Sequence, residues 1–402
     1  MEPVPTPEVA TPADGSPAAP TPRVLFLAFL SLGAAAFRGT AVVAHIRALV
    51  VARRRWLSAE DHAEGAALCE LVPGANGLQS AAWVGWRLAG LPGALAAAGG
   101  FILPAAAAML ALSLGYVELR RLPAAAPALA GLRVSAVALL AHGALSSGRL
   151  TVRSLGGGVL VVIGALAFLA GLGPFQTVVT ASLLAALVVP PRPPAGPLPA
   201  PPVVIGRREL LPPAHILLAA SVLLAVAFLV DRRLDEVGFA MAKVEWLSFG
   251  GAFGAVPPLV QEGIKVKGWV DSGGFLDGLA LALVTPGPTA LVAGFLGLQA
   301  AGLLGALVGM IGVFVPTLLI LLVAEPWSAR VRAEATLAAG MDGARAAVVG
   351  MLLAVTVQLG RAGVTWTPRT EALGAAVFLA ALLGARPAWI IPVAVAASAW
   401  LG

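Results

Sequence analysis

Long apolar segments alternate with short polar stretches along this chain of 402 residues. The most continuous apolar runs extend over residues 94–114, 159–172, 215–230, 302–323 and 347–360. A helix needs about 20 apolar residues to cross the hydrocarbon core of a bilayer, and these runs approach or reach that length with their flanks. The short alternating segments that are typical of a transmembrane β-barrel do not occur. The pattern predicts an all-α polytopic membrane protein with about 10–13 transmembrane helices.

Two of these apolar segments contain a proline followed by a glycine, at Pro73-Gly74-Ala75 and at Pro286-Gly287-Pro288. Proline removes a backbone donor and clashes with the preceding turn, so each pair predicts a broken helix. Backbone groups at membrane depth must be paired within the protein or line a cavity. Two matching breaks are the best pointer that a sequence offers to the substrate site of a transporter.

The two breaks belong to two copies of one unit. Pro73 precedes Pro286 by 213 residues (286 − 73), and a later set of residues repeats at a spacing of 212. That set pairs Gly90, Gly93, Pro104 and Arg133 with Gly302, Gly305, Pro316 and Arg345. We therefore predict a first repeat over residues 24–190 and a second repeat over residues 236–402.

Three segments lie outside the repeats. Residues 1–23 contain seven prolines and lack the basic and apolar regions of a signal peptide, so we expect a disordered tail. Residues 191–213 are proline-rich and predict a linker outside the membrane. The apolar residues 214–230 have no counterpart in the other repeat and predict an extra transmembrane helix.

Each repeat should contain a first helix, a polar loop that ends at a tryptophan, two half-helices around the break, and three or four full spans. The loop over residues 38–56 contains five arginines and no acid, whereas that over residues 250–269 contains Glu262, Lys265 and Lys267. Strongly basic loops stay on the cytoplasmic side. One extra helix between the repeats would place the two loops on opposite sides, so we expect inverted repeats.

Composition narrows the function classes. Apolar residues make up 59% of the chain and charged residues 11%, which suits a membrane protein rather than a soluble one. The net charge of +6 comes from scattered arginines without a basic stripe interleaved with aromatics, so we expect no nucleic-acid partner. Cys69 is the single cysteine, and the four histidines lack metal-ligand spacing. We expect neither a metal site nor a cofactor.

Arg133 and Arg345 are candidate anion ligands. Each follows its expected helix start, near residues 125 and 336, by eight or nine residues, which corresponds to about 12–13 Å and a position close to mid-bilayer. An arginine there should face the protein interior and a partner. Its planar guanidinium can hold an oxyanion by two parallel hydrogen bonds. A structural salt bridge or a side chain that snorkels to the interface is the alternative.

Acids near the breaks are candidates for proton coupling. Glu64 aligns with Asp277 (277 − 64 = 213), and each lies nine residues before its break proline. Glu70 lies three residues before Pro73 within an apolar run. A carboxyl group in a half-buried site can take up and release protons at physiological pH. Alternatively, Glu64 and Asp277 are helix-start acids that face water.

Polar residues and glycines follow the breaks. Gly74, Asn76 and Gln79 accompany the first break, and Gly287 and Thr289 accompany the second. Free amides at the start of a helix attract anions, so we expect these residues to contact the substrate. Asn76 and Thr289 can also serve as caps of their half-helices.

The residues at the C-terminal end of the first helix are expected to have a structural role in both repeats. Phe37-Arg38-Gly39 aligns with Phe249-Gly250-Gly251, and glycines there allow close approach or a sharp turn. Arg38 in place of a glycine could guide anions to the site.

Taken in order, these residues resemble the chromate ion transporter family in its long, two-domain form. Each family domain has an F-G-G element, a basic loop that ends in tryptophan, an acidic stretch that runs into P-G-P, and then spaced glycines and a proline. The second half supplies Phe249-Gly250-Gly251, Trp269, Asp277, Pro286-Gly287-Pro288, Gly302, Gly305 and Pro316. The first half supplies Trp56, Pro73-Gly74, Asn76, Gln79, Gly85, Gly90, Gly93 and Pro104. The first half departs from the family at Arg38, at Ala75, which replaces the second proline, and at Glu70, where glutamine is common.

The resemblance implies export of chromate from the bacterial cytoplasm, driven by the proton gradient, with sulfate as a similar anion. It implies a multi-pass protein of the inner membrane whose partners are a small oxyanion and the lipid bilayer, with a homodimer as a candidate assembly. A sulfate or other oxyanion transporter and a passive anion channel are the alternative functions. An enzyme that acts on a phosphorylated lipid would need a nucleophile or base cluster, which the chain lacks, so we expect no enzymatic activity.

Overall fold

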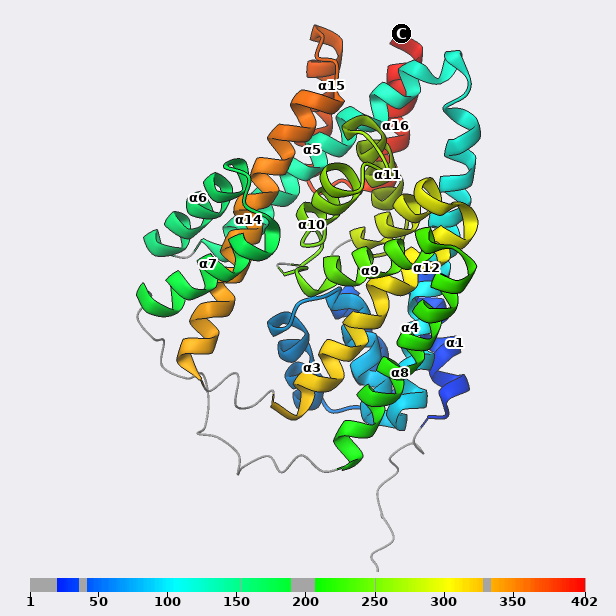
Figure 1. The fold of residues 1–402 in the computed structure, drawn as a ribbon, viewed down its shortest axis with the longest axis vertical. Coiled ribbons are helices and arrows are strands. Elements are labelled where there is room, and N and C mark those ends of the chain that lie inside the picture. Colours follow the sequence, from blue (N-terminus) through cyan, green and yellow to red (C-terminus); the bar gives the residue numbers. More distant parts are fainter. Residues whose placement is uncertain are drawn as a thin grey trace, which may run out of the picture.

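The computed structural model describes residues 20–35, 42–152, 154–188, 207–249, 251–327 and 334–401. All regular secondary structure in these segments is helical (Figure 1). The prediction of an all-α fold is confirmed.

The helices of the two repeats follow one another in the same order. The first repeat contains α1 (Pro22–Ala35), α2 (Val42–Arg47), η2 (Ala48–Arg53), α3 (Ala59–Leu71), α4 (Asn76–Leu119), η3 (Pro123–Ala125), α5 (Ala126–Thr151), α6 (Leu155–Leu169) and α7 (Pro174–Val188). The second contains α9 (Arg232–Trp246), α10 (Val256–Val260), η4 (Gln261–Val266), α11 (Ser272–Val284), η5 (Thr289–Leu291), α12 (Val292–Ala324), η6 (Glu325–Trp327), α14 (Ala335–Gly363), α15 (Pro368–Leu382) and α16 (Pro387–Leu401). Between them lies α8 (Arg207–Val230), which begins inside the segment for which we expected a linker.

Five helical segments of the described chain are long and apolar enough to cross a membrane, by length and composition. They are Asn76–Leu119, Pro123–Thr151, Pro213–Val230, Thr289–Trp327 and Thr336–Gly363. Shorter apolar helices accompany them in both repeats. The protein is therefore a multi-pass helical membrane protein, and the count of ten to thirteen spans stays a prediction.

The loops that we expected before Trp56 and Trp269 are largely helical, so that expectation is wrong. In their place, α2 continues into the π-helix η2, and α10 continues into the π-helix η4. Ile46, Val50 and Leu259 are fully buried on these segments. The apolar residues recur at helical spacing, and their burial stabilises a helix in spite of the arginines on the other face.

The long helices α4 and α12 each contain a sharp reversal at a glycine. Gly90 has φ 59° and ψ −152°, and Gly302 has φ 65° and ψ −155°, a backbone region that is essentially restricted to glycine. A Cβ atom on Gly85 would overlap the carbonyl oxygen of Gly93, although eight residues of a straight helix would separate them by about 12 Å. The helix before each reversal therefore folds back onto the helix after it.

The two repeats interlock through their long helices α5 and α14. In Figure 1, α14 runs diagonally past α6 and α7 of the first repeat, and α5 packs in turn on α15 and α16 of the second. A Cβ atom on Gly131 of α5 would press against Ala394 of α16, and one on Gly343 of α14 would press against Ala181 of α7. These contacts are equivalent, because 343 − 131 is 212 and 394 − 181 is 213. Small residues thus let the helices approach closely at both crossings.

The reversal in α4 predicts a difference between two glycine substitutions in the same helix. Gly90→Ala should destabilise the protein by about 1–3 kcal/mol, because alanine strains the backbone at that φ and ψ. Gly99→Ala should stabilise it by about 0.5–1 kcal/mol, because Gly99 is helical and its Cβ would meet open space. Thermal unfolding of the purified variants in detergent measures both. Equal melting temperatures would show that the reversal does not constrain the fold.

Candidate functional site

Both proline-glycine segments separate two helices. After α3 the chain is extended at Val72 (ψ 153°) and Ala75 (ψ 94°), and after α11 it is extended at Thr285 (ψ 152°) and Pro288 (ψ 148°). We refer to residues 72–75 as the first break and to residues 285–288 as the second break. That the breaks lie at membrane depth stays a prediction.

Side chains from the start of α4 bind the carbonyl groups of the first break. Gln79 Nε2 donates to the Pro73 carbonyl oxygen at 2.7 Å. The Asn76 amide, in the orientation that satisfies its hydrogen bonds, donates to the carbonyl oxygens of Gly74 at 3.3 Å and Cys69 at 3.2 Å. Both predicted substrate ligands therefore also stabilise the broken backbone.

Helix α9 and the residues after it bind the amides of the first break. Gly74 N donates to the Ser248 carbonyl oxygen at 2.8 Å, and Ala75 N donates to Glu245 Oε1 at 3.1 Å. The Thr317 hydroxyl of α12 also donates to Glu245 Oε1. Glu245 and Thr317 are fully buried. A carboxyl group of the second repeat thus accepts a hydrogen bond from a backbone amide of the first break.

Sequence reasoning missed Glu245 and Thr317. One feature pointed to Glu245: it lies four residues after Met241 and eight after Val237, both buried, and so on the apolar face of α9. Thr317 follows Pro316 and occupies the position equivalent to Ala105 in the first repeat (317 − 105 = 212).

The second break is less polar. The Thr289 hydroxyl donates to the Ala252 carbonyl oxygen, and a Cβ atom on Gly287 would lie 2.9 Å from the Cβ atom of Ala105. Each break therefore packs near the residue that follows the proline in the long helix of the other repeat, which is Thr317 for the first and Ala105 for the second.

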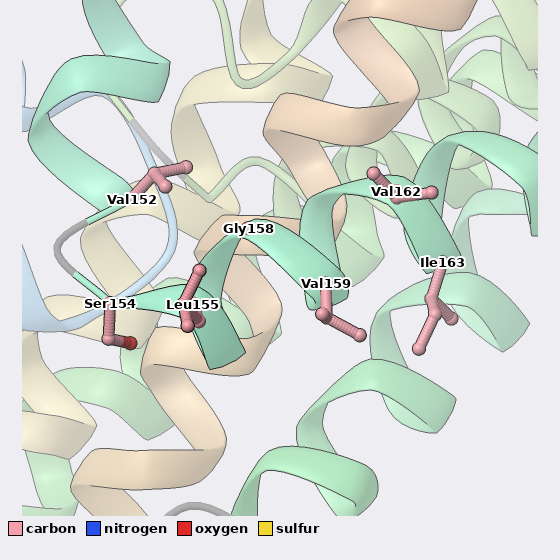
Figure 2. A pocket seen from close by; sticks show the side chains of 7 residues that line it. All are labelled: Val152, Ser154, Leu155, Gly158, Val159, Val162 and Ile163. Atoms are coloured by element: carbon pink, nitrogen blue, oxygen red, sulfur yellow. The ribbon is translucent and has the colours of Figure 1, made fainter.

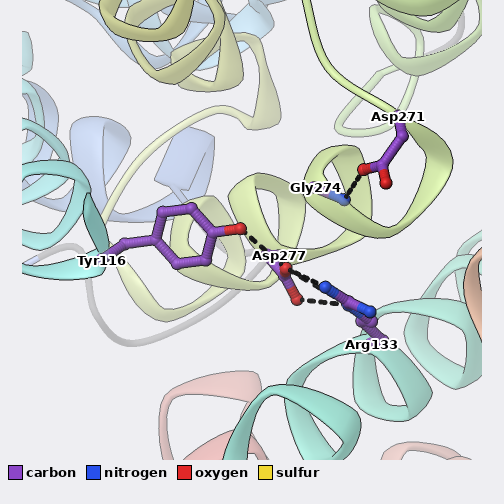
Figure 3. A network of polar contacts seen from close by, with 5 residues as sticks. All are labelled: Tyr116, Arg133, Asp271, Gly274 and Asp277. Atoms are coloured by element: carbon purple, nitrogen blue, oxygen red, sulfur yellow. Dashed lines mark hydrogen bonds and ion pairs between the residues drawn. The ribbon is translucent and has the colours of Figure 1, made fainter. Parts of the chain in front are cut away.

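Arg133 forms a buried ion pair with Asp277, to which Tyr116 adds a hydrogen bond (Figure 3). Arg133 Nε lies 3.0 Å from Asp277 Oδ1, Arg133 Nη2 lies 2.9 Å from Oδ2, and the Tyr116 hydroxyl donates to Oδ2 at 2.9 Å. Asp277 is fully buried, whereas the Arg133 side chain is 33% exposed. A Cβ atom on Gly273 would lie 2.9 Å from Arg133 Cζ, so glycine provides room for the guanidinium.

Arg345 makes the equivalent contact between the repeats, from the second repeat to the first. Its Nη2 donates to the Glu70 carbonyl oxygen at the end of α3, and its Nη1 lies 3.3 Å from Asp342 Oδ1. Each arginine therefore binds the half-helix that precedes the break of the other repeat. Arg345 lies beside the first break, whereas the partner of Arg133 lies nine residues before Pro286, about 13 Å along α11.

The predicted acids fall in different environments. Asp277 is fully buried, whereas Glu64 and Glu70 are exposed on α3. Among the F-G-G residues, Gly251 has φ +86°, which requires glycine, and Phe249 packs against the main apolar core. Phe37, Arg38, Gly39 and Gly250 lie outside the described residues.

An apolar pocket on α6 is unsuited to an oxyanion. Val152, Ser154, Leu155, Gly158, Val159, Val162 and Ile163 line it (Figure 2). None of these residues carries a charge, and Leu155 and Val159 are exposed. Such a surface suits lipid acyl chains. Within the described part of the chain, no group of three or more histidine, cysteine, aspartate or glutamate side chains could hold a metal ion.

The sequence comparisons agree with the repeated architecture. The family model described as Chromate transporter matches the chain twice, over residues 23–189 and 236–402. The chain belongs to the chromate transporter family. The predicted resemblance is confirmed.

Relatives align with this member of the chromate transporter family over most of its length. A chromate transport protein of Cupriavidus metallidurans is 30% identical over 387 residues, which cover 94% of this chain and 92% of that one. A chromate transport protein of Pseudomonas aeruginosa is 29% identical over 372 residues, which cover 89% and 85%. An uncharacterized transporter of Methanocaldococcus jannaschii is 31% identical over 342 residues, with 84% of each chain covered. No solved structure matches the chain.

The ion pair between Arg133 and Asp277 joins the two repeats of this chromate transporter family member. It predicts that substitutions of the two residues have non-additive effects on stability. Asp277→Leu leaves Arg133 without its partner and should cost near the lower end of about 3–5 kcal/mol, because the arginine is one-third exposed. The double variant Arg133→Leu/Asp277→Leu should cost less than the sum of the single variants. Unfolding in detergent measures the cycle.

A matched control breaks an exposed pair. Glu118→Gln removes the ion pair with Arg121, whose side chains are 71% and 68% exposed, and should change stability by less than about 1 kcal/mol. Additive single costs in the Arg133 and Asp277 cycle would show that the pair does not join the repeats energetically.

Proposed function

We propose that this protein is a secondary active transporter that exports a tetrahedral oxyanion, with chromate as the first candidate, from the cytoplasm under the proton gradient. Membership of the chromate transporter family supports the substrate class. The observation that carries the proposal is the contact of Arg345 with the last turn of α3, next to the first break, after which α4 begins with free amides.

The start of α4 supplies donors for an oxyanion. The amides of Asn76, Gly77 and Leu78 have no hydrogen-bond acceptor among the described residues. Such amides and the positive end of the helix dipole favour an anion. Arg345 Nη2 is held by a carbonyl group rather than by a carboxylate, so an oxyanion can recruit this guanidinium without breaking an ion pair on that nitrogen.

The remaining predicted residues take supporting roles in this proposal. Gly74 lets the chain approach Gln79 and Glu245, since a Cβ there would lie 3.3 Å from Glu245 Oε1 and its φ is +130°. The proposed substrate ligands are Arg133, Arg345, Asn76, Gln79, Gly74, Gly287 and Thr289. The proposed coupling acids are Glu70, Glu64 and Asp277, and the proposed break prolines are Pro73, Pro286 and Pro288.

Alternating access would move one repeat against the other about the breaks. The reciprocal packing of α5 and α14 supports this, because a shift of either long helix moves terminal helices of the other repeat. We propose inverted repeats over residues 24–190 and 236–402, separated by the linker and by the extra helix α8. We also propose the bacterial inner membrane as the location, sulfate as a second substrate and a homodimer as an assembly.

Proteoliposomes that contain the purified protein test this function. Radiolabelled chromate should accumulate against its gradient when a pH gradient is imposed across the membrane. Steady anion current without proton movement would instead identify a passive channel. If neither a pH gradient nor a voltage moves chromate, the proposed function is wrong.

Substitution of Arg345 tests the binding site. Arg345→Gln should weaken chromate binding by about tenfold to a hundredfold, because a hydrogen bond to a charged group contributes about 1.5–3 kcal/mol. Arg361→Gln on the same helix, where the side chain is exposed, serves as the control and should bind chromate as the native protein does. Quenching of tryptophan fluorescence by chromate measures the affinities, and equal affinities of the two variants would remove Arg345 from the site.

A further inference from the structure

Glu245 is a fully buried acid whose carboxyl group is only half satisfied. Its Oε1 accepts hydrogen bonds from the Ala75 amide and the Thr317 hydroxyl. Its Oε2 has no hydrogen-bond partner among the described residues. The side chain is 0% exposed.

No cation in the described structure pairs with this carboxyl group. Lys243, on the same helix, binds Glu262, and Glu236 binds Lys267. The elements with the most contacts to α9 are α8, α10 and α12, and neither α10 nor α12 carries an ionisable side chain. Lys243 of α9 also contacts η4, which carries Glu262 and Lys265. The ionisable residues of α8 are Arg207, Arg208, Glu209 and His215, and those next to the first break are Cys69, Glu70 and Arg345.

A second unpartnered acceptor lies on the same break. Gln79 Oε1 is buried without a donor, while Gln79 Nε2 is bound to Pro73. A Cβ atom on Gly74 would lie 2.5 Å from Gln79 Nε2 and 3.3 Å from Glu245 Oε1, so the two side chains flank that glycine. Two buried acceptors without donors need a proton or a cation.

The neutral carboxyl group fits this environment. Oε1, as the carbonyl oxygen, keeps both of its donors, and Oε2 carries the proton as a hydroxyl. An ionised carboxylate would leave Oε2 buried without compensation. Ionisation becomes favourable when the break opens to water, because water can then solvate Oε2.

We propose that Glu245 is a further residue that binds and releases a transported proton, and that the first break senses its charge through the Ala75 amide. This inference rests on the proposed function and assigns coupling to an acid beyond Glu64, Glu70 and Asp277. Release breaks the O–H bond at Oε2 and passes the proton to water. The resulting carboxylate binds the Ala75 amide and Thr317 more strongly, because a charged acceptor strengthens both hydrogen bonds. The break is thereby held more tightly when Glu245 is ionised than when it is protonated.

Exchange and coupled transport in proteoliposomes separate this role from a structural one. Glu245→Gln retains an oxygen for Ala75 and Thr317 and replaces Oε2 by a neutral donor group, so it mimics the protonated state. The variant should exchange chromate for chromate at the native rate, while the proton flux that accompanies net chromate transport, measured with a pH-sensitive dye, is lost. The pH dependence of net transport should also be lost.

One further variant and one ion complete the test. Glu236→Gln on the same helix is the control and should keep native exchange and native proton flux. Persistent proton flux in Glu245→Gln overturns the proposal. Transport that requires Na⁺ and carries no protons would convert the two acceptors into a sodium site and also overturn it. Absence of chromate exchange in the native protein would contradict the proposed function instead.

Discussion

The reciprocal packing of the long helices α5 and α14, each against helices of the opposite repeat, is the constraint on which the rest of the structure depends. Apolar side chains give helices no preference for each other over lipid, so close packing of small residues and polar contacts must hold them together. Gly131 and Gly343 provide the close approach, and Arg133 and Arg345 provide the polar contacts. Neither repeat has a complete set of neighbours by itself. Each repeat therefore supplies neighbours to the long helix of the other.

Both breaks are also contacted by the opposite repeat. The amides of the first break are bound by α9 and by Ser248, which follows α9, and the Glu70 carbonyl group in the last turn of α3 is bound by α14. The second break lies against Ala105 of α4. The backbone partners of the first break therefore come in part from the opposite repeat.

Much of this arrangement could be predicted from sequence, and the failures have physical causes. Hydropathy predicted the long helices, and the spacing of 212–213 residues predicted which arginines, glycines and prolines are equivalent. The helices η2 and η4 were expected as loops because their basic side chains obscured a buried apolar face. The contact between Glu245 and Ala75 spans 170 residues, and no local pattern encodes such a distance. Asp277 was identified as a candidate acid. Its ion pair with Arg133 depends on the packing of α5 against the opposite repeat, which sequence periodicity does not reveal.

Divergence of the repeats explains why one break carries the polar groups. Glu245 corresponds to Gly33 (245 − 33 = 212), which packs against the backbone of Phe101, and Thr317 corresponds to Ala105. The positions that hold a carboxyl and a hydroxyl group at the first break are thus a glycine and an alanine at the second. A polar break can change its hydrogen bonds with protonation or with an anion, whereas an apolar break repacks without such dependence. The carboxyl and hydroxyl groups of Glu245 and Thr317 are therefore found at the first break, and the equivalent positions of the first repeat carry neither.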